Sequence, residues 1–126
     1  MARMEAVQHI GVDIIEIKRI EEAIQHFGSS FLERTYTARE IECYKEKLPS
    51  LAARFSGKEA VIKALDAPGI SPRDIEILSA PDGKPLITLY GRAREKAEKL
   101  GLAGLDISLS HSREYAVAFV VGQSQD

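Results

Sequence analysis

Apolar and polar residues alternate along residues 7–15, which is the pattern of a β-strand with two different faces. Ile10, Val12 and Ile14 share one face of this predicted strand. Asp13 is on the opposite face, close to the end of the strand. The pattern therefore predicts a strand that carries one carboxylate away from its apolar side.

Four segments carry helix signals. In the first, apolar residues recur at spacings of three and four, and Gly28 follows as a stop. Thr37, with Glu40 three residues later, forms a capping-box pattern that begins a short helix. Pro49 is typical of the first turn of a longer helix, which is rich in Ala, Leu, Lys and Arg. The predicted helices cover residues 17–27, 37–44, 49–65 and 92–100.

The remaining strand signals come in two pairs. The runs 73–78 and 86–90 are joined by residues 81–85, a turn by composition. The runs 106–111 and 115–121 have hairpin spacing. The last run is apolar on both faces, which favours burial of the second face by a helix or by another subunit. Together the elements predict an α+β domain, in which an antiparallel sheet carries the long helix on one face.

Composition narrows the class of protein. The chain has 126 residues, so a single domain over residues 1–126 is expected. Its 17 basic and 19 acidic residues give a net charge of −2, which argues against a general nucleic-acid-binding protein. The single cysteine excludes an internal disulfide and a zinc site built on several thiolates. Because no apolar run approaches the ~20 residues that span a bilayer and no signal pattern is present, we expect a soluble cytoplasmic protein without a membrane partner.

Glu59 and Lys63 are four residues apart on the long predicted helix, so they share one face. From the spacing alone, an exposed ion pair worth about 0.3–0.5 kcal/mol is the favoured interpretation. The alternative is a carboxylate metal ligand beside an ammonium directed at phosphate. Gly57, in the middle of this helix, indicates close packing or the approach of a ligand, because glycine weakens a helix.

Asp13 and His111 each allow a structural and a functional interpretation. Asp13 could cap the following helix, or it could join Glu59 as an oxygen ligand of Mg²⁺. The two residues are 46 positions apart, so spacing alone does not pair them. His111 lies between two serines at the end of a predicted strand, where a half-buried histidine bonded to the hydroxyls is the favoured interpretation.

Arg54 and the turn at residues 82–85 are positions that could meet a phosphate group. As a helix-surface charge and an ordinary turn, however, these positions need no function. The sequence has no Walker-type loop and no dinucleotide-binding fingerprint.

Several segments, taken in order, resemble the small single-domain 4′-phosphopantetheinyl transferases of bacteria, the holo-acyl-carrier-protein synthase family. The resemblance covers nearly the whole chain, and the G-V-D, K-E-A-x-x-K and S-x-S-H blocks together are highly specific. The matching segments are IGVDIIEI (10–17), YTARE (36–40), RFSGKEAVIKA (54–64), DIEIL (74–78), DGKP (82–85) and SLSHSREYAVAF (108–119).

The resemblance implies a transferase fold and a reaction of fatty acid biosynthesis. The 4′-phosphopantetheine arm of coenzyme A moves to a serine of apo-acyl carrier protein, and adenosine 3′,5′-bisphosphate is released. Asp13 and Glu59 would be the Mg²⁺ ligands, and Lys63 would contact the phosphates and could offset charge or supply a proton. His111 would lie at the phosphates of coenzyme A. As the base for the serine hydroxyl, Glu59 or a water held by the metal ranks ahead of His111.

The resemblance also implies a homotrimer, with coenzyme A lying between subunits. Its adenosine and 3′-phosphate would be contacted by Arg54 and by the turn of Gly83, Lys84 and Pro85, with Ser110 beside His111 as a further contact. Lys18 and Arg19, on the first helix, would dock the acidic carrier protein.

The chain departs from the family pattern in the docking helix, where His26 and Ser29 stand at positions expected to be more basic. Weaker carrier association with a smaller salt dependence is therefore expected. Two other functions fit the same residues. One is a non-catalytic module that binds coenzyme A or a nucleotide, and the other is a Mg²⁺-dependent phosphohydrolase.

Overall fold

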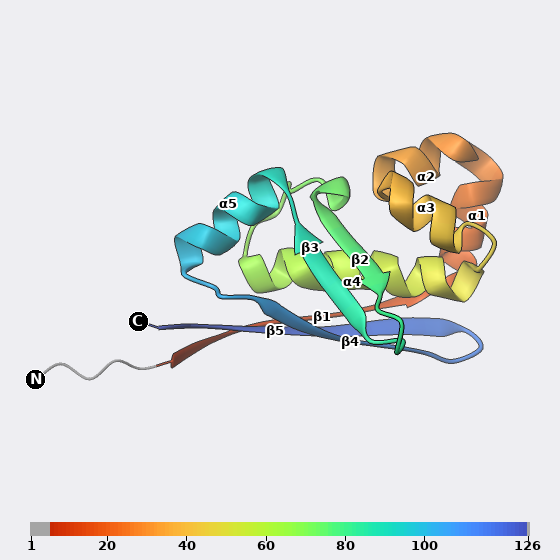
Figure 1. Ribbon diagram of the computed structural model, residues 1–126. Helices are drawn as coiled ribbons and strands as arrows, with labels where there is room; N and C mark the ends of the chain where they lie inside the picture. Colours follow the sequence, from red (N-terminus) through yellow and green to blue (C-terminus); the bar gives the residue numbers. More distant parts are fainter. Residues whose placement is uncertain (1–5, 126) are drawn as a thin grey trace, which may run out of the picture.

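Strands lie at both ends of the chain and helices fill most of the region between them (Figure 1). The computed structural model describes residues 6–125. The elements are β1 (Ala6–Glu16), α1 (Ile17–Phe27), α2 (Ser29–Thr35), α3 (Ala38–Tyr44), α4 (Leu48–Leu65), η1 (Pro72–Asp74), β2 (Ile75–Ser79), β3 (Pro85–Leu89), α5 (Gly91–Leu100), β4 (Leu105–His111) and β5 (Tyr115–Gln125). None of the helices within residues 6–125 is long and apolar enough to cross a membrane.

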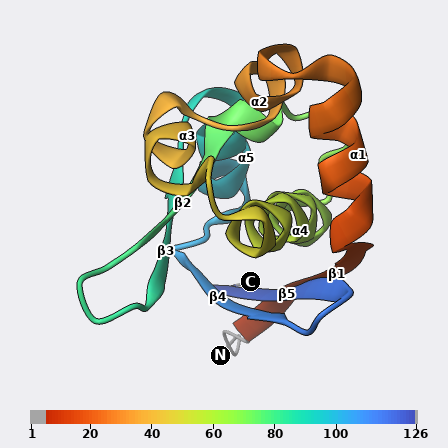
Figure 2. The ribbon, with the colours of Figure 1, turned by 90° about the vertical axis from the view of Figure 1, so that its right-hand side faces the viewer.

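The strands form two antiparallel sheets. One has the order β1-β5-β4, and the other pairs β2 with β3. Helix α4 runs along the three-stranded sheet, and Figure 2 shows it end-on above that sheet. The predicted α+β class, antiparallel pairing and packed long helix are thus confirmed, with the strands divided between two sheets.

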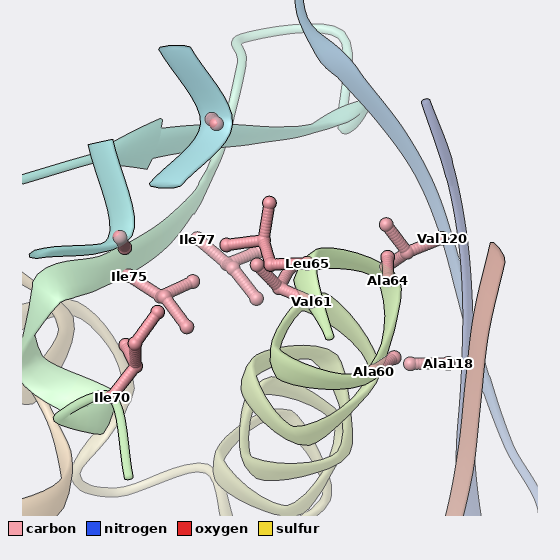
Figure 3. Packing of buried hydrophobic residues seen from close by; sticks show 11 residues of the cluster. Ala60, Val61, Ala64, Leu65, Ile70, Ile75, Ile77, Ala118 and Val120 are labelled. Carbon is pink, nitrogen blue, oxygen red and sulfur yellow. The ribbon is translucent and has the colours of Figure 1, made fainter. Parts of the chain in front are cut away.

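Helix α4 has buried residues on more than one side because it lies between the two sheets. Ala60 and Ala64 point toward Ala118 and Val120 of β5, whereas Val61 points toward β2 (Figure 3). The alanines permit close approach of the helix to the strands, and the larger residues fill the space on the other side. The predicted helix over 49–65 is confirmed, beginning one residue earlier.

Local capping signals agree with the structure. Thr37 Oγ1 accepts the backbone N–H of Glu40 at 3.2 Å, and Glu40 Oε1 accepts the N–H of Thr37 at 2.9 Å, so the predicted capping box is present. Gly28 ends α1 with a φ of 56°, as expected. Gly28 is also the N-cap of α2, a helix that the sequence analysis did not predict.

The strand expected over residues 73–78 begins later. Residues 72–74 form a 3-10 turn because Pro72 favours a helical start and Ser71 Oγ accepts the N–H of Arg73 at 3.3 Å. Strand β2 starts only at Ile75, so this part of the prediction is wrong.

The apolar face of β1 is exposed. Ile10, Val12 and Ile14 share one face as predicted, with exposed fractions of 54%, 53% and 63%. Phe119 is opposite Val12 in the sheet register and is 46% exposed. The other face of β5 is buried under α4, which accounts for one of the two apolar faces predicted for this strand.

Candidate active site

Asp13 lies beside α4 because β1 runs directly along that helix. It lies on the inner face of β1, two residues after Gly11, and faces the same way. A Cβ atom at Gly11 would overlap the carbonyl oxygen of Ala60 and lie 2.9 Å from Ala64 N, so only glycine permits this approach. Asp13 does not cap α1, since the N-cap is Glu16 and has no side-chain bond. The capping interpretation is therefore wrong.

Lys63 pairs with Asp13. Its Nζ lies 3.2 Å from Asp13 Oδ1 and donates to the carbonyl oxygen of Val12 at 2.9 Å. Among the described ion pairs there is none between Lys63 and Glu59. The surface pair suggested by helix spacing is therefore wrong, and Lys63 instead joins α4 to β1.

Glu59 is half-buried beside these groups. Burial raises the pKa of its carboxyl above the usual range, the negative charge of Asp13 raises it further, and Lys63 partly offsets the effect. Asp13 and Glu59 line one cavity of about 310 Å³, together with Arg19, Phe31 and Phe55. The structure thus brings together the two carboxylates that spacing alone could not pair.

The donor set fits Mg²⁺ as it binds in phosphoryl-transfer sites. Such sites commonly use one or two protein carboxylates and leave the remaining positions to water and substrate phosphate. Asp13 and Glu59 supply that number, and their mutual repulsion would be relieved by a cation. Within residues 6–125 no group of three or more His, Cys, Asp or Glu residues could enclose a metal ion.

Arg54 lies in a second cavity, of about 290 Å³, which Ser110 and His111 also line. The guanidinium is buried: Nε donates to Ile77 O at 3.1 Å and Nη2 to Ser79 Oγ at 2.8 Å. Its central carbon lies 3.8 Å from the centre of the Tyr44 ring. The helix-surface interpretation of Arg54 is wrong, because the side chain is fixed under the cavity with further N–H donors available.

His111 is exposed at the end of β4. Among the described residues it has no hydrogen bond to Ser110 or Ser112, so the half-buried interpretation is wrong. The turn that contains Gly83 and Lys84 is also exposed, and its residues line neither cavity.

The two basic residues of α1 are exposed. Arg19 lines the cavity of Asp13 and Glu59. Lys18 lines a neighbouring cavity of about 390 Å³ between α1 and the hairpin that joins β4 to β5.

One buried ion pair was not anticipated. Lys58 and Glu40 are fully buried, with Lys58 Nζ 2.7 Å from Glu40 Oε1. The ammonium also donates to Pro72 O at 2.9 Å and to Ile75 O. Burial lowers the pKa of Lys58, although Glu40 opposes the shift. A signal was present, because Lys58 is spaced seven residues from both Leu51 and Leu65 and therefore lies on their buried helix face.

Gly57 has a packing role. A Cβ atom at this position would lie 2.5 Å from Ile77 Cδ1 and 3.2 Å from Ile107 Cδ1. Of the two interpretations, close packing is confirmed: Gly57 lets both sheets approach α4.

Comparison with known proteins places the chain in a family. The model of the 4′-phosphopantetheinyl transferase superfamily matches residues 9–120. A holo-[acyl-carrier-protein] synthase of Dehalococcoides mccartyi is 53% identical over 116 residues, covering 91% of this chain and 98% of the relative.

Solved structures agree. The Helicobacter pylori holo-[acyl-carrier-protein] synthase in complex with coenzyme A has a TM-score of 0.81 and 40% identity, covering 90% of this chain and 98% of that one. A Chronobacterium ammoniagenes complex with coenzyme A has a TM-score of 0.84 and 28% identity, covering 95% and 99%. The chain, with its carboxylate pair on β1 and α4, thus belongs to the 4′-phosphopantetheinyl transferase superfamily and to its holo-[acyl-carrier-protein] synthases.

Proposed function

We propose that this protein transfers the 4′-phosphopantetheine arm of coenzyme A to a serine of apo-acyl carrier protein, in fatty acid biosynthesis. The observation that carries the proposal is the cavity lined by Asp13 and Glu59, with Lys63 bonded to Asp13, in a chain 53% identical to a holo-[acyl-carrier-protein] synthase. The serine oxygen bonds to phosphorus, the pyrophosphate bond breaks, and adenosine 3′,5′-bisphosphate leaves with the electron pair.

The residues around the cavity suit this displacement. Asp13 and Glu59 would hold Mg²⁺, which when bound would neutralise phosphate charge and favour departure of the bisphosphate. The Lys63 ammonium is exposed enough to reach phosphate oxygens and offset their charge. Glu59, or a water held by the metal, would accept the serine proton, because both lie where the hydroxyl would approach the phosphate.

The adenosine half of coenzyme A is assigned to the second cavity. Buried Arg54 would offer its free N–H donors to a phosphate, with Ser110 and His111 on the same wall. Gly83 and Lys84 of the exposed turn, with partly buried Pro85 at the start of β3, would contact the 3′-phosphate or the adenosine.

A homotrimer would join these parts. In one subunit the carboxylate pair and Arg54 line different cavities, so a ligand that contacts both types of site could lie across a subunit boundary. The exposed apolar face of β1 and β5 supports this arrangement, because burial of such a face stabilises an interface. Lys18 and Arg19 on α1 would dock the carrier protein beside the carboxylate cavity. The reaction is assigned to the cytoplasm.

Intact-mass spectrometry tests the function. Apo-acyl carrier protein is incubated with the protein, coenzyme A and Mg²⁺, and a parallel sample contains a chelator. A carrier mass gain of one phosphopantetheine group, absent with chelator, is the expected result. Binding of coenzyme A without any mass gain would indicate a binding module, and bisphosphate release without carrier modification would indicate a hydrolase.

Two variants connect the activity to the site. Glu59→Ala is expected to abolish the mass gain while circular dichroism remains that of the folded protein, because truncating a partly exposed helix glutamate costs little stability. Glu95→Ala, at an exposed position on α5, is the matched control and should keep full activity. Activity retained by Glu59→Ala would contradict the assignment.

A further inference from the structure

The ammonium of Lys63 is bonded to Asp13, one of the two carboxylates that line the cavity. It comes from α4, and both its acceptors, Asp13 Oδ1 and the carbonyl oxygen of Val12, belong to β1. The Lys63 side chain is 56% exposed, whereas that of Asp13 is 17% exposed. The mobile partner of this pair is therefore the lysine, and it can leave without disturbing the packed core.

Lys63 supplies positive charge to both carboxylates. Asp13 raises the pKa of Glu59 through its negative charge, while Lys63 acts in the opposite direction. Two carboxylates that share one cavity repel each other, and a single ammonium offsets only part of that repulsion. This is the place where a divalent cation would compensate the charge more fully.

We infer that Lys63 is an internal counter-ion of Asp13, which must leave that carboxylate before a divalent cation can be held by Asp13 and Glu59. The inference rests on the proposed function, because it concerns the same cation site. Lys63 and the cation carry like charges and compete for Asp13. The lysine thus weakens cation binding as long as no phosphate ligand is present.

Release of Lys63 has a second consequence. An ammonium with three donors that has lost Asp13 is free to bond a pyrophosphate oxygen near the same cavity. The cation would displace Lys63 from Asp13, and a phosphate of coenzyme A would bond the released ammonium. Each ligand would therefore strengthen the binding of the other. By thermodynamic reciprocity, each must tighten the other by the same factor.

Lys63→Met tests the competition, since methionine keeps an unbranched side chain but has no charge. Thermal unfolding is measured without coenzyme A, in chelator and in saturating Mg²⁺. In chelator the variant should melt below the wild type, because its carboxylates lose their counter-ion. Mg²⁺ should raise its melting temperature by more than it raises that of the wild type. Lys99→Met, at an exposed position on α5, should match the wild type in both conditions.

Binding of Mn²⁺, followed by electron paramagnetic resonance, gives the size of the effect. Removing the competing surface charge should tighten cation binding roughly two- to fivefold. Coenzyme A should tighten cation binding in the wild type and do so less in Lys63→Met. Lys63→Arg, which keeps the charge, should resemble the wild type, and Lys63→Gln, which is also uncharged, takes the place of Lys63→Met if that variant fails to fold.

The outcomes separate the two proposals. If Mg²⁺ stabilises the wild type and Lys63→Met equally, or the variant less, the counter-ion role is overturned and the proposed cation site stands. Both the counter-ion role and the proposed cation site are overturned by the following result: Mg²⁺ does not change the melting temperature of the wild type or of Lys63→Met, and Mn²⁺ binds to neither protein, whether or not coenzyme A is present. A larger response of Lys63→Met, with Lys63→Arg like the wild type, supports the inference.

Discussion

Gly11 of β1 lies against the backbone of Ala60 of α4 so closely that a Cβ atom on the glycine would overlap the alanine's carbonyl oxygen. This contact brings the inner face of β1, and with it Asp13, to the helix that carries Glu59. Gly11→Ala should therefore push the strand from the helix and cost about 1–3 kcal/mol in the free energy of unfolding, as overpacking does. Urea denaturation measures that loss.

The transfer rate of Gly11→Ala should fall more than its folded fraction explains, because the carboxylates no longer meet at the same separation. Gly104→Ala is the matched control, since nothing lies within 4 Å of a Cβ atom there. A Gly11→Ala enzyme with wild-type stability and rate would show that the close approach is unimportant.

Glu59 should make the stability of the protein depend on pH. Its pKa is raised above the ordinary value of 4.5 in the folded state, so the folded protein holds this proton more tightly than the unfolded chain. The free energy of unfolding therefore decreases as the pH rises from 4.5 through the raised pKa, and the loss is complete above it.

Glu59→Gln removes this titration. In chelator, its stability relative to the wild type should increase as the pH rises through the same window and then stay constant. Denaturation series at matched pH values measure the difference in the free energy of unfolding between the two proteins. Contributions from other titrating groups cancel in this difference. Parallel stability curves for the two proteins would contradict the pKa shift.

Much of the fold could be predicted because its signals are local. The capping box of Thr37 and Glu40 lies within four residues, and the hairpin of β4 and β5 follows from strand patterns around a short connection. Side-chain chemistry and the family resemblance predict Asp13 and Glu59 as a metal-binding pair, and in the structure both carboxylates line one cavity.

Contacts between distant segments could not be predicted in this way. Helix spacing suggested Glu59 as the partner of Lys63, but the ammonium bonds to a strand that packs alongside the helix. The local pattern allowed Arg54 to be a helix-surface charge, because the acceptors that fix its guanidinium belong to β2, more than 20 residues away. Such residues are placed by tertiary packing, which the local pattern does not contain.

Lys58 should be essential for stability. Its ammonium is the cation beside fully buried Glu40, and it also bonds the carbonyl oxygens of Pro72 and Ile75. Lys58→Met would leave the carboxylate buried without a counter-charge, at a cost of about 3–5 kcal/mol. Chemical denaturation measures this loss, with Lys99→Met as the control.

The double variant Lys58→Met, Glu40→Leu separates an unpaired charge from lost packing. Removing both charges should recover part of the stability, because no buried carboxylate is left uncompensated. A loss below about 1 kcal/mol for Lys58→Met alone would contradict the role of this ion pair in stability.

The apolar face of β1 and β5 should be required for assembly. Phe119 lies in register with Val12 on this face, and both side chains are about half exposed in a single subunit. Phe119→Glu would introduce a charge that is costly to bury, so sedimentation equilibrium should show monomers of this variant and the proposed trimers of the wild type. Leu86→Glu, at an exposed apolar position on β3, should stay trimeric. A monomeric wild type, or a trimeric Phe119→Glu variant, would contradict this interface.

Docking of the carrier protein should depend on Arg19 through long-range charge. Arg19 is exposed on α1 and lines the carboxylate cavity, so it can attract an acidic carrier toward the reacting groups. Arg19→Ala should raise the KM for the carrier several-fold at low salt and leave the KM for coenzyme A nearly unchanged. The difference from the wild type should shrink as salt is added, because screening removes the same attraction.

His26→Arg should act in the opposite direction. It restores a basic residue at the far end of α1, where the resemblance led us to expect one, and should increase both the carrier association rate and its salt dependence. Arg94→Ala removes a charge that pairs with Glu98 on α5, away from the cavity, and should change neither parameter. Stopped-flow measurements over a salt series give the carrier association rate of all three variants. If that rate depended on salt equally in Arg19→Ala, His26→Arg and the wild type, carrier docking would lie on another surface.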